Sequence, residues 1–321
     1  MMNIAIFGDI HGRLLLPFLL CARWEREHDD TIHHALCVGD LGIYRGLHTM
    51  DKASRRWAKK FPEELGFSKY FRRFDESLRH VVGHPIADEV FAGTDLQLMF
   101  LPGNHEEHDY LHQLRAEYAR SADQPLAVDR HWEGLARGHY AQDAFSGYGR
   151  LLCLPQGKVV TVDGPLDKTS WEPAVQISLL AVNGLDAFTP REAWSARHTG
   201  PIQIMLTHET YLGRLRGSDP SGRRDDYGSQ RLLELIKKLG PNYHFFGHHH
   251  WHYPEVELKT DHARHTRSVG LNQVFFESRD AGISRGCFGI LRINSPRELH
   301  FDIVEDAWFE ALHYADVQAY L

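Results

Sequence analysis

The chain has 321 residues, of which 42% are hydrophobic and 25% are charged, and its formal net charge is −7. This composition is typical of a folded globular protein, and the negative charge argues against binding of nucleic acid through a basic field over the whole surface. The four cysteines are widely spaced without a CxxC pair. This spacing argues against a zinc knuckle or a disulfide framework and indicates buried thiols in a reducing compartment.

The N-terminal residues predict a strand, a loop and a helix. Residues 3–8 form an apolar run that leads into Asp9, and residues 13–27 carry apolar side chains at helical spacing. The start lacks the features of a secretory signal, and no stretch of the chain has the length and hydrophobicity of a membrane span. We therefore expect a soluble, cytoplasmic protein that does not bind membranes.

Two more strands are predicted in the first half, each followed by a polar motif. Residues 34–38 precede a Gly-Asp pair, and residues 96–101 precede a Gly-Asn-His-Glu motif. A helix is predicted over residues 106–120, because good helix formers follow acidic residues in its first turn. The polar motifs thus stand at the carboxyl ends of strands, where open α/β sheets place their ligands.

The segment between these two strands contains basic and aromatic side chains in alternation, and we predict a helical insertion there at residues 47–93. The simpler interpretation is two amphipathic helices over the stretch from Lys52 to Arg79, with the aromatic side chains inward and the charges in solvent. The alternative is an insertion beside the active site that holds an anionic or base-bearing substrate by charge and stacking.

The second half is predicted to be richer in strands. Apolar runs end just before Asn183, His208 and His248, and residues 228–239 form a clear amphipathic helix. Further strands are predicted at residues 174–182, 202–206, 243–246, 255–258, 267–271, 274–277, 287–293 and 298–304. This pattern favours two packed sheets with helices outside. We expect one catalytic domain over residues 1–305 and a helical tail over residues 306–321, which either covers an edge or a partner or is solvated.

Five short motifs in this order carry the polar residues: GDIHG at 8–12, GD at 39–40, GNHE at 103–106, HE at 208–209 and GHHH at 247–250. Asp, Asn and His supply the oxygen and nitrogen donors that borderline divalent cations such as Mn, Fe and Zn accept. In an extended loop, Asp9 and His11 would project to one side and could hold one cation together, as could His248 and His250. Two metals about 3.5 to 4 Å apart can clamp both oxygens of an in-line displacement at phosphorus, which favours hydrolytic chemistry.

Individual residues of these motifs suggest different roles. Asp40 has two carboxylate oxygens and could bridge two cations. Asn104 offers a neutral carbonyl oxygen, His208 completes the shell of the second cation, and the adjacent His105 is free for proton transfer.

The ordered set D-x-H, G-D, G-N-H-E, H and G-H-x-H resembles the signature of the calcineurin-like metallophosphoesterases from Asp9 to His250. The resemblance implies a four-layer α/β/β/α sandwich of two mixed sheets. It also implies that one metal is held by Asp9, His11 and His250, that the other is held by Asn104, His208 and His248, and that Asp40 bridges them.

The same resemblance implies a mechanism. A hydroxide shared by two divalent cations attacks phosphorus, and His105 protonates the leaving oxygen. We expect the cations to be Mn²⁺, with Fe, Zn or Ni as alternatives. Glu106 is expected to cap a helix or to orient a ligand.

The residues after Asp40 bear on the branch of the family. Phosphoprotein phosphatases continue this motif as G-D-x-V-D-R-G, where the second Asp pairs with the catalytic His. This chain reads GDLGIYRG, so that Asp is absent and the arginine, Arg45, comes one residue later. The layout is more similar to that of lariat RNA debranching enzymes, although those carry Cys where this chain has Asp9.

The leading hypothesis is therefore a phosphodiesterase that acts on a nucleotide or on an RNA or DNA end. Arg45 is a candidate for phosphate binding, although a surface arginine is an equal alternative, and Arg214 and Arg216 are candidates at the mouth of the site. The alternatives are a phosphomonoesterase that acts on a phosphoprotein or a small metabolite, and a noncatalytic binding scaffold.

Overall fold

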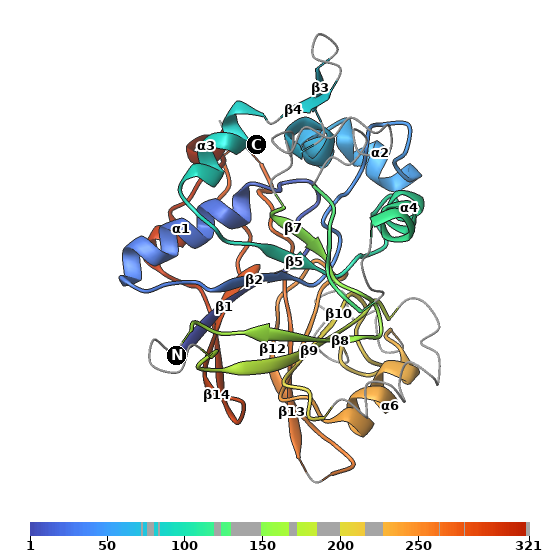
Figure 1. The fold of residues 1–321 in the computed structure, drawn as a ribbon, viewed down its shortest axis with the longest axis vertical. Coiled ribbons are helices and arrows are strands. Elements are labelled where there is room, and N and C mark those ends of the chain that lie inside the picture. Colours follow the sequence, from blue (N-terminus) through green and yellow to red (C-terminus); the bar gives the residue numbers. More distant parts are fainter. Residues whose placement is uncertain are drawn as a thin grey trace.

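A computed structural model of the protein describes residues 1–71, 73–75, 80–82, 84–118, 123–129, 149–166, 172–184, 200–215, 227–262, 264–278 and 280–318. Two mixed β-sheets pack face to face, and helices cover their outer faces (Figure 1). This arrangement confirms the α/β sandwich of two mixed sheets that was expected from the sequence.

The first sheet has the strand order β15-β14-β1-β2-β5-β7-β6. Its strands β1, β2, β5 and β7 run parallel, whereas β14, β15 and β6 pair antiparallel. The bounds are Met2–Phe7 for β1, His34–Cys37 for β2, Leu98–Phe100 for β5, Leu126–Ala127 for β6, Leu151–Cys153 for β7, Phe288–Ser295 for β14 and Glu298–Ile303 for β15.

The second sheet has the strand order β12-β13-β11-β10-β9-β8. Here β9, β10, β11 and β13 run parallel, and β8 and β12 close the two edges as antiparallel strands. The bounds are Val159–Asp163 for β8, Gln176–Val182 for β9, Ile204–Thr207 for β10, Tyr243–Phe246 for β11, Tyr253–Lys259 for β12 and His265–Gly270 for β13.

Side chains of β1 show how the layers are built. Alternate residues point to opposite faces of a strand, so Ile4 and Ile6 enter the core between the two sheets while Ala5 and Phe7 enter the core beneath helix α1, Leu16–His28. Because both faces are covered, β1 is an unbroken apolar run.

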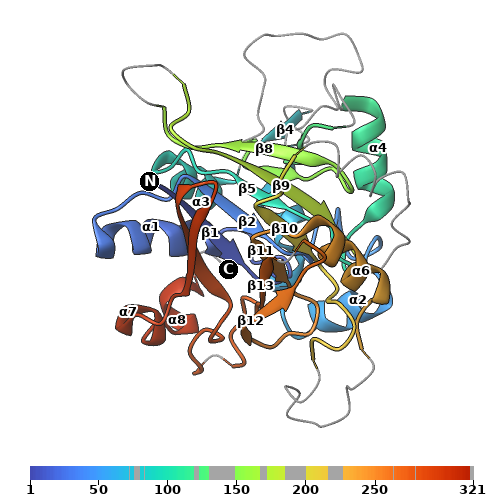
Figure 2. The same cartoon turned by 90° about the horizontal axis from the view of Figure 1, so that it is seen from below.

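Helix α6, Gln230–Leu239, covers the outer face of the second sheet (Figure 2). Its residues Leu232, Leu235 and Ile236 are buried against that sheet. The helix begins where the Ser229 side chain accepts a hydrogen bond from the Leu232 amide and ends at Gly240, whose φ of 58° is readily adopted by glycine. On the other side of the molecule, α4, His108–Tyr118, follows the GNHE motif.

The insertion between β2 and β5 differs from the two amphipathic helices that were expected. It contains α2, Lys52–Ala58, a 3₁₀ turn at Pro62–Leu65, a π-helical turn at Phe67–Phe71, the strand pair β3, Arg73–Asp75, and β4, His80–Val82, and then α3, Pro85–Ala92. A proline starts the 3₁₀ turn and Gly66 follows it, which divides the helical pattern into short pieces. Phe67, Tyr70 and Phe71 point inward as predicted, whereas Trp57 is 51% exposed.

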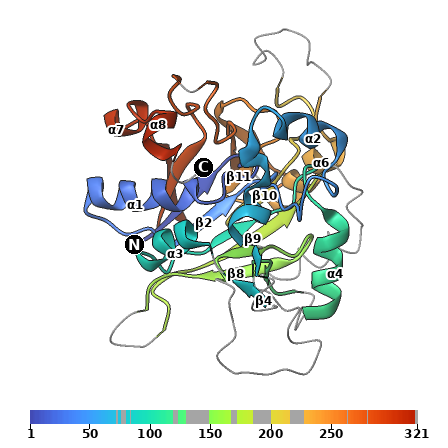
Figure 3. The same cartoon turned by 90° about the horizontal axis from the view of Figure 1, so that it is seen from above.

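The C-terminal tail packs on the protein itself. It forms two short helices, α7, Ala307–Glu310, and α8, Tyr314–Val317, which lie beside α1 in both Figures 2 and 3. Phe309 and Val317 are buried in the same core cluster as α1, so the described part of the tail covers this face and is not a solvated end.

Three smaller features complete the fold. Residues 274–277 were predicted to be a strand, but Phe276 makes only an isolated bridge to Ile283. The side chain of Phe276 is nevertheless buried. All four cysteines are buried and unpaired, as expected. Within the described ranges, no helix has the length and apolar character needed to cross a membrane.

Candidate metal centre

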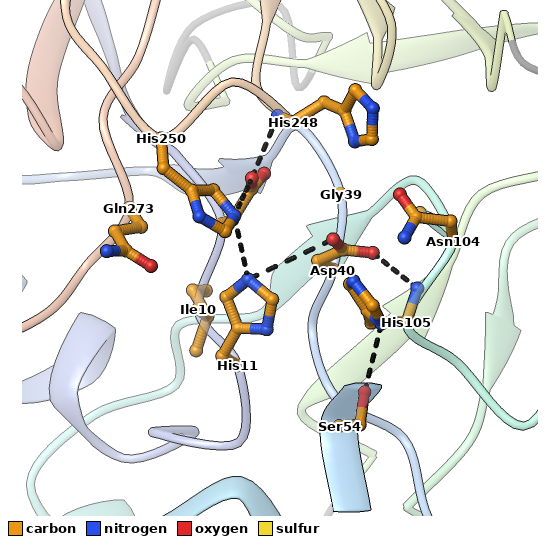
Figure 4. Close-up of polar contacts among 12 residues, drawn as sticks. Ile10, His11, Gly39, Asp40, Ser54, Asn104, His105, His248, His250 and Gln273 are labelled. Atoms are coloured by element: carbon orange, nitrogen blue, oxygen red, sulfur yellow. Dashed lines mark hydrogen bonds and ion pairs between the residues drawn. The ribbon is translucent and has the colours of Figure 1, made fainter. Parts of the chain in front are cut away.

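The predicted ligands meet where strands of both sheets end. Asp9 follows β1, Asp40 follows β2, Asn104 follows β5, His208 follows β10 and His248 follows β11. Because the carboxyl ends of parallel strands lie at one edge of a sheet, these loops face one another across the two sheets (Figure 4).

The side chains form two groups that share Asp40. One group contains Asp9, His11, Asp40 and His250, the other contains Asp40, His208 and His248, and the donor atoms of each group lie within 4.8 Å of one another. Asn104 adjoins the second group, because its Oδ1 lies 2.9 Å from His208 Nε2. This division is the one that the family resemblance implies.

The polar atoms of this cluster fit bound cations. Asp9 Oδ1, Asp40 Oδ2 and His208 Nδ1 are buried, and no hydrogen-bond partner is found for them within the described part of the chain. His11 Nε2 lies 3.1 Å from His250 Nε2, so two ring nitrogens that can each offer a lone pair face one another. Buried polar atoms are normally satisfied, and divalent cations would satisfy these.

Main-chain amides orient the two carboxylates. The His105 amide donates to Asp40 Oδ1 at 2.7 Å, which leaves Oδ2 facing His208 Nε2 at 3.3 Å. In the same way the His248 amide donates to Asp9 Oδ2 at 2.8 Å, and that oxygen also lies 3.3 Å from His250 Nε2. Each acid is thus positioned by the loop of another motif.

The glycines of the motifs allow this close approach. A Cβ atom at Gly103 would lie 2.1 Å from Asp40 Oδ1, one at Gly247 would lie 2.2 Å from Asp9 Oδ1, and one at Gly39 would lie 2.1 Å from His208 Nδ1. The sequence therefore needs glycine at these positions because a ligand side chain occupies the place of the Cβ.

The ligand loops are not extended, contrary to the geometry that was expected for the D-x-H and H-x-H spacings. Left-handed φ angles of 47°, 42°, 65° and 49° occur at His11, Asp40, His248 and His250. Such angles are uncommon for residues other than glycine and tend to cluster at functional sites. The curled loops still bring Asp9 together with His11, and both with His250.

Electrostatics within the cluster favour its charged forms. Burial raises the pKa of Asp40, but the nearby His208 outweighs burial, and the pKa of this carboxyl is lowered below its usual range. Conversely, burial lowers the pKa of His208, but Asp40 and Asp9 raise it to about 9. A bound cation would take the place of these protons beside the acids.

His105 has an acidic partner that the sequence motif did not reveal. Its Nδ1 lies 3.0 Å from Asp51 Oδ2 and 2.9 Å from Ser54 Oγ. Asp51 is the N-cap of α2, where its Oδ1 accepts hydrogen bonds from the amides of Ala53 and Ser54, and its Oδ2 accepts one from Tyr44 Oη at 2.7 Å. Although burial raises the pKa of Asp51, the hydrogen bonds from His105 and Ser54 lower it overall.

The acidic residues beside the motifs support the loops. Glu106 is buried, and its two oxygens accept hydrogen bonds from the amides of Leu41 and Ile43, both at 2.6 Å, so it holds the loop that follows Asp40. Glu209 Oε1 lies 2.8 Å from His249 Nε2, and His249 does not belong to either ligand group.

Two of the three predicted arginines, Arg45 and Arg214, are not part of the ligand cluster. Arg45 is held by Glu107, with its Nε 2.6 Å from Oε1, and its guanidinium lies over the Tyr110 ring. Arg214 is buried, and its guanidinium donates to the carbonyls of Pro254, Tyr253 and Ser268. Through these hydrogen bonds Arg214 links strand β12 to strand β13. Arg216 lies outside the described residues.

A cavity adjoins the cluster on the side of the insertion. It is lined by His11, Ser54, Trp57, Phe61, Glu64, His105, His250, Gln273 and Phe275. Trp57 and Phe61 come from the basic and aromatic stretch of the insertion, so this part of it lies beside the candidate site.

Residues 2–252 match the family model of the calcineurin-like phosphoesterases, which covers most of the chain. The chain belongs to this family. The family match agrees with the cluster of aspartate and histidine side chains at the strand ends.

Individual similarities to other proteins are weaker. A lariat debranching enzyme of Arabidopsis thaliana is 22% identical over 269 residues, a stretch that covers 78% of this chain and 54% of the relative. The chain therefore spans about half the length of that relative.

Two solved structures were also compared. A purple acid phosphatase from yellow lupin seeds is 13% identical and matches with a TM-score of 0.39, over 94% of this chain and 51% of the other. A Staphylococcus aureus protein described as a 5′-nucleotidase is 9% identical and matches with a TM-score of 0.42, over 96% and 55% of the two chains. The family assignment rests on the family match and not on these structures.

Proposed function

We propose that this calcineurin-like phosphoesterase hydrolyses phosphodiesters of a nucleotide or a nucleic acid, with two divalent cations in its active site. The observation that carries the proposal is the pair of ligand groups that share Asp40. In this assignment Asp9, His11 and His250 hold one ion, Asn104, His208 and His248 hold the other, and Asp40 contacts both.

The donor set suits several first-row metals, and we propose Mn²⁺, with Fe, Zn or Ni able to replace it. When bound, the ions would polarise the phosphoryl oxygens and lower the pKa of water. The cytoplasmic location expected from the sequence stays a prediction.

His105 would act as the general acid. Its Nδ1 faces Asp51 and Ser54, so Nε2 is the ring nitrogen that can give a proton to the leaving oxygen. Asp51 would hold the ring in this tautomer and orientation, much as a buried acid positions the histidine of other hydrolases.

The surroundings of the cluster favour a diester over a monoester. A phosphomonoester carries more negative charge at neutral pH than a diester, and arginine is well suited to recognise such charge. The described residues that line the cavity include aromatic, histidine and amide side chains but no arginine. Arg45 stays a candidate for contact with phosphate, in which case Glu107 would have to release part of its guanidinium.

The phosphomonoesterase remains the second candidate because of the Asp51–His105 contact. Phosphoprotein phosphatases are expected to pair the catalytic histidine with an aspartate, and Asp51 supplies such a partner from a different position in the sequence. A noncatalytic scaffold is disfavoured, since it would gain nothing from two buried carboxylates that each have one oxygen for which the described residues offer no hydrogen-bond partner.

A comparison of two chromogenic substrates tests the proposal. The protein loaded with Mn²⁺ should hydrolyse bis-p-nitrophenyl phosphate with a higher kcat/KM than p-nitrophenyl phosphate. The reverse order would favour the phosphomonoesterase. A panel of cyclic nucleotides, dinucleotide polyphosphates, single-stranded and branched RNA and a phosphopeptide would then narrow the substrate.

A further inference from the structure

The cavity beside His105 has an aromatic wall that the metal chemistry does not require. Trp57 stacks near Phe61 with ring centroids 5.7 Å apart and planes at 27°, and Phe61 meets Phe275 edge to face with centroids 5.0 Å apart. These three rings line one cavity together with His105 and His250. They come from two segments more than 200 residues apart in the sequence, so the fold brings them together.

The buried side chain of Arg13 holds the inner part of this wall in place. The Arg13 guanidinium lies 4.8 Å from the centroid of Phe275 and 5.9 Å from that of Phe61, and Arg13 is only 3% exposed. Its guanidinium also donates to the His11 carbonyl. Cation–π contacts of this kind stabilise ring positions, so the two phenylalanines are held in place without a ligand.

The outer part of the wall is exposed. Trp57 is 51% exposed although its ring is large and apolar. Trp57 follows Ser54 by three residues on α2, and residues at this spacing lie on one face of a helix. Since Ser54 contacts His105, the helix face that supports the proposed proton donor also carries the exposed indole.

We propose that this wall, Trp57, Phe61 and Phe275, stacks on a nucleobase of the substrate while the phosphodiester lies at the metal centre. The inference rests on the proposed function. Base–aromatic stacking tolerates different bases because every base has a π-face. Gln273, which lies near His250 in Figure 4 and lines the same cavity, adds an amide that can both donate to and accept from a base edge.

The test compares a dinucleoside monophosphate with an abasic analogue that keeps the sugar and the phosphodiester. Wild-type protein should show a KM for the dinucleotide about ten-fold lower than for the abasic compound, as expected for one stacked base. Trp57→Ala should remove most of this difference, while Trp57→Phe should keep most of it. Trp251→Ala is the matched control, because Trp251 is 50% exposed and lines a different cavity.

Three results would overturn the inference: equal KM values for the two substrates in wild-type protein, an unchanged preference in Trp57→Ala, or the same loss of preference in Trp251→Ala. Hydrolysis of both substrates without a preference would leave the phosphodiesterase proposal intact, so the two proposals fail separately. If neither is hydrolysed, dialysis binding of the dinucleotide and the abasic compound to wild type and Trp57→Ala decides the stacking proposal alone. A single-stranded oligonucleotide as a third substrate distinguishes a nucleic-acid strand from a free nucleotide as the source of the base.

Discussion

Asp51 Oδ2 lies 3.0 Å from His105 Nδ1, and the two residues are 54 positions apart in the sequence. The contact joins the N-terminus of the insertion helix α2 to the GNHE motif that follows β5. Tyr44 and Ser54 donate hydrogen bonds to the same carboxylate of Asp51, so His105 shares this acidic partner with them. The insertion therefore contributes to the proposed proton donor as well as to the cavity beside it.

Asp51→Asn should reduce kcat by about ten-fold or more, while metal content and helix stability stay near those of the wild type. Asparagine is an equally good N-cap, so the substitution removes the charge beside His105 without removing the cap of α2.

The control for this prediction is Asp51→Ala, which should also destabilise α2. An unchanged kcat in Asp51→Asn, with the metal content of the wild type, would show that Asp51 does not act through His105.

His105→Ala should retain bound metal but lose turnover by about 10²-fold to 10⁴-fold, the range for removal of a general acid. Asp40→Ala should lose metal as well as activity, because Asp40 belongs to both ligand groups. Metal analysis of each purified variant together with steady-state kinetics checks this. Equal metal loss in the two variants would contradict the separate roles.

Gly103→Ala should weaken metal binding although it adds only a methyl group. The new Cβ would lie 2.1 Å from Asp40 Oδ1, so the carboxylate or the loop must move. Gly93→Ala is the matched control, because the nearest atom to its Cβ would be 3.9 Å away. Titration with Mn²⁺ should show a Kd raised by at least ten-fold for Gly103→Ala, and a normal Kd in this variant would mean that Asp40 is not constrained as described.

His244 should make the protein less stable in mild acid. Burial lowers the pKa of His244 to about 3, and its ring contacts Thr207 and Ser268 inside the second sheet. The unfolded chain binds a proton below the usual pKa of 6.5 whereas the folded protein does not, so stability is lost as the pH falls from 6.5 towards 3. At pH 5 this difference in proton binding lowers the free energy of unfolding by about 2 kcal/mol.

Urea unfolding of wild type and His244→Gln at pH 7 and pH 5 measures this effect. The variant is expected to have a lower free energy of unfolding at pH 7, because two buried hydrogen bonds change. Between pH 7 and pH 5, however, its free energy of unfolding should fall by about 2 kcal/mol less than that of the wild type. An identical loss in both proteins would show that His244 is protonated in the folded state.

The strand-end motifs were predictable from the sequence because each one is local. A short apolar run followed by Gly and a polar residue predicts a strand that ends in a polar loop without any knowledge of distant residues. The structure places Asp9, Asp40 and Asn104 after β1, β2 and β5, as expected. The conformation of the loops was not predictable in this way. The D-x-H spacing indicated an extended loop, but His11 has a left-handed φ and its amide donates to the Asp40 carbonyl of another motif.

Features that depend on long-range contacts were missed. Asp51 is an ordinary N-cap in the sequence, and its contact with His105 depends on how the insertion folds over the centre. Arg214 was a candidate for the mouth of the site, yet its guanidinium is buried and donates to main-chain carbonyls of two strands. Residues 274–277 form an apolar run typical of a strand, but in the described part of the chain they make only the isolated bridge from Phe276 to Ile283.

Metal content measured together with activity tests the central claim most directly. The metal-free protein and the Asp40→Asn variant should be compared with wild type reconstituted with Mn²⁺, in hydrolysis of bis-p-nitrophenyl phosphate. We predict that each wild-type chain binds two ions and that its activity disappears when the metal is removed and returns on reconstitution. Asp40→Asn should lose both the bound metal and the activity. Full diester hydrolysis by the metal-free protein, or normal metal content and activity in Asp40→Asn, would contradict a two-metal centre built around Asp40.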